Sequence, residues 1–233
     1  MRSNIIKPGF YSLQVAADSR RAEFDIKNEV IIANNIPVDF VFIGDSITQR
    51  WELNAFFGNK GKMILNRGIG GDTSEYVLKR FEADVLQLKP GVCIMNIGIN
   101  DSWELEGDPW TCREGKKMHL IESLTISNIN SIIEKSNMYG LKLVVCSILP
   151  TNMSFTTKNV ERNQFIVNVN KTIKSICETK NCIYVDFHSR LVGADGFTIA
   201  DDLTIEGIHP HVVGYNIMAK VLREILALSS IEI

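Results

Sequence analysis

Short apolar runs alternate with longer amphipathic segments along this chain. Five runs are nearly continuously apolar, which is typical of strands buried on both faces: Val38–Ile43, Met63–Leu65, Val92–Ile97, Leu141–Ile148 and Cys182–Phe187. Apolar residues recur at helical spacing in five further segments: Ser19–Asn34, Thr73–Leu88, Met118–Met138, Asn159–Thr179 and Val212–Leu228. Strands that alternate with helices predict an α/β fold, in which a five-stranded parallel sheet is covered by helices on both faces.

Length and composition predict a single domain over residues 1–233. Single α/β domains often reach about 250 residues, and 45% of the residues are hydrophobic, which is enough for one large core. No internal repeat and no linker rich in Pro, Gly or Ser divides the sequence. The net charge is -2 and the basic residues are scattered, so nothing indicates nucleic-acid binding.

The N-terminal stretch Met1–Tyr11 lacks the apolar core of a signal peptide. No stretch approaches the about 20 apolar residues of a membrane span. We therefore expect a cytoplasmic protein that does not bind membranes, and the sequence leaves a homo-oligomer open. Among five cysteines, Cys93 and Cys146 fall in apolar runs and are expected to be buried thiols, whereas Cys177 and Cys182 flank a turn where they could approach each other.

Polar segments follow the predicted strands, and this placement indicates a site. In open parallel sheets, ligands bind beyond the carboxyl ends of the strands. Four polar segments follow the first four runs, and a fifth precedes the last helix: Gly44–Ser46, Asn66–Thr73, Gly98–Asp101, Pro150–Asn152 and Glu206–Pro210. We expect them to meet at one edge of the sheet.

Each of these segments also has a purely structural interpretation. Asp45 or Ser46 can cap the following helix, Asn100 can form a turn, and His209 can be an ordinary loop residue. The glycines at positions 68, 70 and 71 can form a tight turn or cradle a phosphate, but Gly-x-Gly-Gly is not the dinucleotide pattern. Their joint placement at strand ends favours a functional site over these separate interpretations.

Four of the segments, in this order, resemble the motif blocks of the SGNH hydrolases, the GDSL-like esterases and lipases. Gly44–Ser46 is similar to the nucleophile block, Asn66–Thr73 to the glycine block, Gly98–Asp101 to the asparagine block and Glu206–Pro210 to the histidine block. The resemblance spans roughly residues 38 to 220. It implies a flavodoxin-like SGNH hydrolase fold, a three-layer α/β/α sandwich, and a carboxylic ester hydrolase that needs no cofactor and no metal.

The resemblance implies that Ser46 is the nucleophile and His209 the base. Serine is a weak nucleophile that needs an adjacent base, and histidine titrates near neutral pH. Ser46 would attack an ester carbonyl to form an acyl-enzyme, which water then hydrolyses. His209 is preferred over His211 because the family's base directly precedes the proline, and His119 and His188 have no comparable context.

The acid of the triad is where this chain departs from the family. The family usually has Asp three residues before the histidine, and Glu206 occupies that position. Glutamate has the same charge and one more methylene, so it could still orient the imidazole. Asp201 and Asp202 lie nearby as reserve candidates.

The resemblance implies an oxyanion hole of three donors. They are the backbone N–H groups of Ser46 and Gly71 and the side-chain amide of Asn100. Glycine lets the backbone approach a substrate closely, and an amide donates without titrating. Asp45 and Asp101 are expected to be hydrogen-bonding supports of these loops rather than metal ligands.

The segment Ser102–Trp110 suggests a pocket wall beside the proposed site. It carries Trp103 and Trp110, whose faces suit sugar rings or short acyl groups, although it could equally be a surface loop with its own small cluster. The sequence therefore favours a small-molecule substrate with a short-chain ester, such as an O-acetylated carbohydrate.

Two interpretations from other functional classes stay open. The chain could be a catalytically weakened or inactive binding module with the SGNH fold, for which Glu206 is the only motif argument. It could also be a flavodoxin-like nucleotide or flavin binder, which Ser46, His209 and the glycine spacing disfavour.

Overall fold

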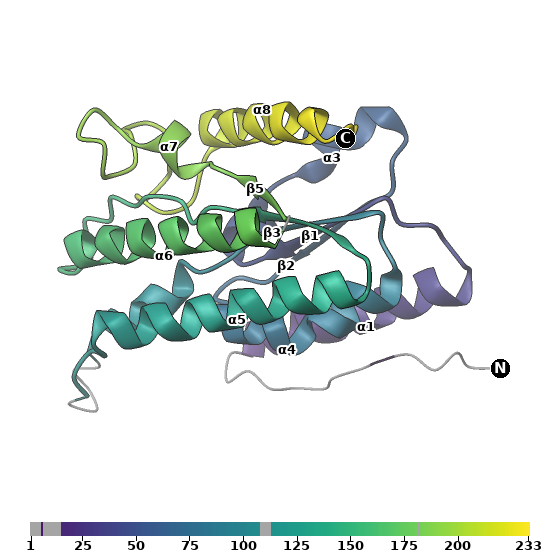
Figure 1. Ribbon diagram of the computed structural model, residues 1–233, viewed down its shortest axis with the longest axis horizontal. Helices are drawn as coiled ribbons and strands as arrows, with labels where there is room; N and C mark the ends of the chain where they lie inside the picture. Colours follow the sequence, from purple (N-terminus) through teal and green to yellow (C-terminus); the bar gives the residue numbers. More distant parts are fainter. Residues whose placement is uncertain (1–5, 7–14, 108–112, 181) are drawn as a thin grey trace.

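The computed structural model describes residues 6, 15–107, 113–180 and 182–233, and its centre is one parallel sheet (Figure 1). The strand order is β2-β1-β3-β4-β5, with the bounds β1 (Phe40–Gly44), β2 (Ile64–Gly68), β3 (Val92–Asn96), β4 (Lys142–Cys146) and β5 (Ile183–Val185). Gly44 pairs with Gly68 on one side and with Asn96 on the other. The three strands that precede the nucleophile, glycine and asparagine blocks therefore end at one level.

Helices cover both faces of the sheet, as the sequence predicts. One face carries, side by side, α1 (Val15–Ala33), α4 (Ser74–Asp84), α5 (Met118–Met138) and α6 (Asn159–Thr179). The opposite side carries α3 (Leu53–Phe57) and α8 (Val212–Leu228) (Figure 1). Shorter elements lie between them: α2 (Ser46–Arg50), α7 (His188–Leu191), and the 3₁₀ turns η1 (Gly58–Lys60), η2 (Leu86–Leu88) and η3 (Asn100–Leu105). The three-layer α/β/α prediction is confirmed.

A buried aromatic cluster fixes α2, α3 and α8 on the sheet. The ring centroids of Phe42 and Trp51 lie 5.7 Å apart, and those of Trp51 and Tyr215 lie 5.4 Å apart. The Tyr215 hydroxyl donates a hydrogen bond of 2.7 Å to the carbonyl of Ile47. Because Ile47 belongs to α2 and Tyr215 to α8, this hydrogen bond fixes the position of α2 relative to α8. None of the helices that the structure describes is long and apolar enough to cross a membrane.

Several predicted element bounds were wrong: α1 begins at Val15, ahead of the predicted Ser19, and α4 and β2 also differ. The helix predicted over Thr73–Leu88 is interrupted after α4, where the Asp84 carboxylate faces buried guanidinium groups and Val85 leaves helical geometry. Strand β2 continues past Leu65 and pairs with β1 as far as Gly68, and its Arg67 side chain is buried, donates to Asn28 and lies over the Phe24 ring. The glycine block therefore begins inside the strand.

The cysteines of the described residues are free thiols. Cys93 and Cys146 are buried, as predicted from their apolar surroundings. Cys177 and Cys182 are not joined by a disulfide, and the Cys182 thiol donates to the Leu143 carbonyl.

Candidate active site

Ser46 is the first residue of α2, directly beyond β1. Asp45 is the N-cap of this helix, and its carboxylate accepts a hydrogen bond of 2.9 Å from the backbone N–H of Ile47. The capping interpretation of Asp45 is thus confirmed, while Ser46 begins the helix with its hydroxyl free to face the site. Burial raises the pKa of Asp45 to about 7, in spite of the hydrogen bond from Ile47.

The hydroxyl of Ser46 meets the imidazole of His209. The distance from His209 Nε2 to Ser46 Oγ is 2.8 Å, and His209 Nδ1 contacts Glu206 Oε1. The additional methylene of glutamate therefore still allows carboxylate contact. Asp201 and Asp202, the reserve candidates, are exposed in a turn. The structure brings Ser46, His209 and Glu206 together in the order of a hydrolytic triad.

The loop that carries His209 is tied to the rest of the site by its backbone. The N–H of Ile205 donates to the carbonyl of His209 over 2.9 Å, and the N–H of Asn152 donates to the carbonyl of Gly207 over 2.8 Å. The segment after β4 therefore supports this loop. At the end of the loop, the His211 side chain caps α8 by accepting from Val213 N–H, so His211 has a structural contact of its own.

Glu206 is half-buried and lies beside His209 and Arg50. Burial alone would raise its pKa, but the hydrogen bond and charge of His209 and the charge of Arg50 lower it by more, so the net pKa lies below the ordinary value. Arg50 Nη1 lies 3.6 Å from Glu206 Oε1. The carboxylate is therefore ionised at neutral pH.

The glycine and asparagine blocks lie beside Ser46. A Cβ built on Gly70 would lie 3.6 Å from Ser46 Cβ, and the N–H of Gly70 donates to the Gln49 side chain over 2.6 Å. Gly71 has φ of 85°, the left-handed region that favours glycine. The Asn100 amide donates a hydrogen bond of 2.9 Å to the carbonyl of Asp72, the residue after Gly71.

Gly68 of this block is explained by the packing of a helix rather than by phosphate binding. A Cβ on Gly68 would lie 2.2 Å from the backbone nitrogen of Gln49. Glycine at this position lets α2 pack against the end of β2. This packing accounts for the residue without any nucleotide.

Behind the site lies a fully buried guanidinium that sequence reasoning missed. Arg80 donates to the carbonyls of Gly44 (2.9 Å) and Arg67 (2.8 Å) and to the carboxylates of Asp72 (2.6 Å) and Asp84 (3.0 Å). Burial alone would lower the pKa of Arg80, but the charges of these two carboxylates raise it. One side chain thus joins the ends of β1 and β2 to the loop that carries Gly71.

Asp101 supports the asparagine block in a similar way. Its buried carboxylate accepts from the N–H and hydroxyl of Ser74 and, over 3.0 Å, from the hydroxyl of Thr125. These bonds join η3 to the first turn of α4 and to α5. The prediction that Asp45 and Asp101 are hydrogen-bonding supports is confirmed.

Trp103 belongs to an aromatic wall in η3. Its ring stacks with that of Phe155, with centroids 6.4 Å apart and an interplanar angle of 20°, and the Arg162 guanidinium lies 4.3 Å from the Trp103 centroid. Arg162 is fully buried and also donates to Ser102 and Glu106. Trp110, the second predicted wall residue, lies outside the described residues.

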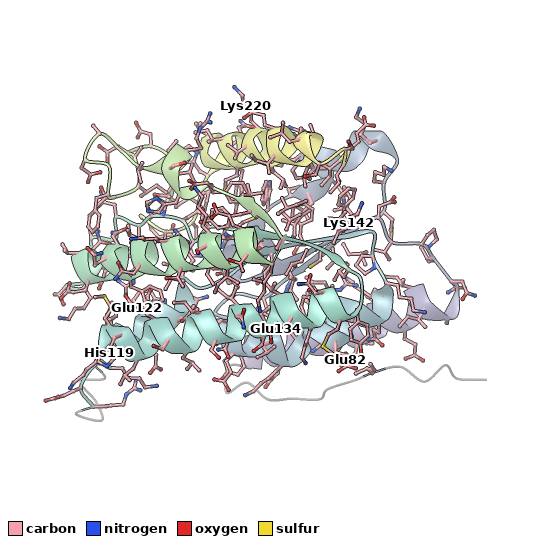
Figure 2. All side chains as sticks on the ribbon, viewed as in Figure 1. Glu82, His119, Glu122, Glu134, Lys142 and Lys220 are labelled. Atoms are coloured by element: carbon pink, nitrogen blue, oxygen red, sulfur yellow. The ribbon has the colours of Figure 1, made fainter. Side chains whose placement is uncertain are left out.

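In the described part of the chain, the remaining histidines and the acidic side chains form no cluster that could hold a metal ion. His119 is exposed in the first turn of α5 (Figure 2), and His188 is half-buried at the start of α7. Over the described ranges, no group of three or more His, Cys, Asp or Glu side chains is arranged to hold a metal ion.

Sequence reasoning missed Arg50, Arg80, Phe155 and Arg162. Arg80 could have been noticed, because it lies next to the apolar stripe of a predicted helix and four residues before Asp84. Arg50 and Phe155 carry no such signal, since their partners are more than 50 residues away in the sequence.

Comparison with known proteins identifies the family. The model of the GDSL-like Lipase/Acylhydrolase family matches residues 42–217, which is most of the chain. The chain belongs to this family. The match includes all four motif blocks, and it supports ester hydrolysis in broad terms.

Individual relatives are distant. The chain is 26% identical to an acetylxylan esterase of Geobacillus stearothermophilus over 176 residues. This alignment covers 74% of this chain and 76% of the relative. It is 31% identical to the uncharacterized lipoprotein YqeF of Bacillus subtilis over 127 residues. This alignment covers 48% of this chain and 49% of the relative. A crystal structure of a proposed acylhydrolase from Bacteroides fragilis superimposes with a TM-score of 0.75 at 26% identity, covering 94% of this chain and 99% of that chain.

Proposed function

We propose that the protein is a serine esterase that hydrolyses short-chain carboxylic esters through an acyl-enzyme on Ser46. The observation that carries the proposal is the line of contacts from Ser46 Oγ to His209 Nε2, at 2.8 Å, and from His209 Nδ1 to Glu206. In this arrangement His209 takes the serine proton as Oγ attacks the ester carbonyl. Glu206 holds the imidazole tautomer and stabilises the imidazolium that forms.

The oxyanion of the tetrahedral intermediate would be held by Ser46 N–H, Gly71 N–H and the Asn100 amide. A primary amide has two N–H donors. The bond from Asn100 to the Asp72 carbonyl uses one of them and fixes the direction of the amide, which leaves the second to donate to the oxyanion. When His209 returns its proton, the alcohol leaves, and water then attacks the acyl-enzyme with the same base.

We infer that the substrate carries a small acyl group, such as the O-acetyl group of a carbohydrate. Two observations support this class. The Trp103–Phe155 pair offers a flat aromatic wall close in sequence to Asn100 and to the loop that contacts Gly207, and the Phe155 side chain remains 62% exposed. In addition, one relative is an acetylxylan esterase. Trp110 is kept as a further wall residue on sequence grounds alone.

The test is a substrate panel with a matched inactive variant. We expect hydrolysis of p-nitrophenyl acetate, a sharp loss of kcat/KM as the acyl chain lengthens, and release of acetate from acetylated sugars. Ser46→Ala should lower kcat by at least about 10³-fold. Wild-type rates in Ser46→Ala would show that another group is the nucleophile, and failure on every ester would favour the binding-module interpretation.

The cytoplasmic location is also kept as a proposal. A relative of half coverage is a lipoprotein, so cell fractionation with an antibody against the chain would decide between the two locations.

A further inference from the structure

Arg50 is a charged residue at the site that none of the motif blocks contains. It ends α2, the helix that begins with Ser46, and its Nη1 lies 3.6 Å from Glu206 Oε1. This is the same oxygen that contacts His209 Nδ1. The side chains of Arg50 and Glu206 are 50% and 35% exposed, so the ion pair lies at the rim of the site.

Apart from the contacts of Oε1 with His209 and Arg50, the Glu206 carboxylate has few restraints in the described part of the chain. Its second oxygen, Oε2, is buried and has no hydrogen-bond partner among the described residues. The last torsion of glutamate is broad, and glutamate has one more rotatable bond than aspartate. A carboxylate held only by His209 could rotate away from the imidazole, so a second contact on Oε1 restricts it.

We propose that Arg50 is a positioning residue that holds Glu206 against His209 and so compensates for the longer acid at this position. The inference rests on the proposed function, because it gives Arg50 a role in the reactivity of Ser46. Arg50 does not contact the reacting hydroxyl; it acts through Glu206.

The charges around this loop define what removal of Arg50 should do. The other titratable groups nearby are Asp45, directly beyond β1, and Tyr215 on α8, and burial raises the pKa of each. Arg50 is the cation that offsets the charge of Glu206. Without Arg50, the Glu206 carboxylate loses its second contact on Oε1, and His209 is held less firmly against Ser46.

The experiment measures how fast a fluorophosphonate labels Ser46 near neutral pH. In this reaction Ser46 Oγ forms a bond to phosphorus, fluoride leaves, and His209 takes the serine proton. We expect Arg50→Met to slow labelling about twofold to fivefold near neutral pH. Arg50→Lys should restore most of the rate. The control Lys220→Met, which removes a cation from the exposed side of α8 (Figure 2), should leave it unchanged.

A second background separates positioning from other roles. In Glu206→Gln, the further change Arg50→Met should have no additional effect, because the charge that Arg50 holds is gone. An equal loss in both backgrounds, or no loss in either, would overturn the proposal. So would a variant that changes only KM for anionic esters, since Arg50 would then bind substrate.

The labelling assay also separates this proposal from the proposed function. It needs no ester substrate. A protein that is labelled at Ser46 with the expected Arg50 dependence but hydrolyses no ester would contradict the esterase proposal alone. A wild-type protein that is not labelled would overturn the role of Arg50 as well.

Discussion

On one side of the site, the residues around Ser46 and Gly71 are tied to a buried guanidinium, whereas His209 and Glu206 on the other side stand on a half-exposed loop. The single side chain of Arg80 donates hydrogen bonds to the end of β1, to the end of β2 and to the carboxylate beside Gly71. The histidine loop depends on backbone bonds, one ion pair at the rim and the helix that follows. The buried side therefore fixes geometry, and the exposed side has room for a different acid.

This difference accounts for where the chain departs from the family pattern. A change of side-chain length in a close-packed interior forces strained rotamers or leaves a void. At Glu206, solvent takes up part of the added length, since the side chain is one-third exposed. We expect substitutions on the buried side to cost stability, and substitutions on the exposed side to cost mainly rate.

The largest effect is expected from Arg80→Met. The change leaves the carboxylates of Asp72 and Asp84 buried with one cation fewer, and breaking such a pair typically costs about 3–5 kcal/mol. Urea denaturation should show this loss in the free energy of unfolding, with an intermediate loss in Arg80→Lys. The exposed control Arg190→Met should stay within about 0.5 kcal/mol. A loss below about 1 kcal/mol for Arg80→Met would mean that the buried side is not held by this residue.

The next effect is expected from Glu206→Gln. Glutamine keeps an oxygen that can accept from His209 Nδ1 but removes the negative charge, so we expect kcat to fall about 10- to 100-fold with KM nearly unchanged. The free energy of unfolding should change by less than about 1 kcal/mol, because the side chain is partly solvated. Steady-state kinetics and urea denaturation of the same preparation test both statements. An unchanged kcat would place the orienting acid elsewhere.

The effect expected from Asp45→Asn depends on pH and is absent under acidic conditions. The pKa of Asp45 is about 7 in the folded state, against an ordinary value of 3.8. Between these values the folded state holds a proton that the unfolded state has lost, so this group lowers stability as pH rises from about 4 to about 7. Asparagine is an equally good N-cap without this charge.

The Asn variant should therefore match the wild type near pH 4 and exceed it at pH 8, by about 1–4 kcal/mol in the free energy of unfolding. Urea denaturation at the two pH values measures the difference. Asp201→Asn, at an exposed position, should show no such pH dependence. If Asp45→Asn is more stable yet slower, the buried charge serves catalysis at the expense of stability. Identical pH dependence in the variant and the wild type would contradict the buried, shifted carboxyl.

Local pattern was enough to predict most of the fold. The bounds of α5, α6 and α8 agree with the predicted segments, because each has a continuous apolar stripe and ends at a polar turn. The bounds of α4 and β2 were wrong, and Asp84 and Arg67 in these elements are buried, which the local pattern of the sequence does not show. Their burial depends on partners from α1 that are distant in the sequence.

The candidate site, like the fold, could be predicted only in part from the sequence. The motif residues could be found from the sequence, since the ends of parallel strands meet whatever the loops between them contain. The contacts of the supporting residues could not be found, because those of Arg80, Arg162 and Arg50 exist only once separate elements pack together. A sequence places a charged residue on a helix, but it does not say which backbone carbonyl that residue will reach.

The measurement that tests the central claim most directly is the identity of the acylated residue during turnover. The wild-type protein is mixed with p-nitrophenyl acetate, quenched in acid within the first turnover, and digested for mass spectrometry. We expect one acetyl group on the peptide that contains Ser46, absent from Ser46→Ala and from a sample quenched after the substrate is exhausted. Hydrolysis without acetylation of Ser46, or acetylation of Ser46→Ala at the same rate, would contradict the account.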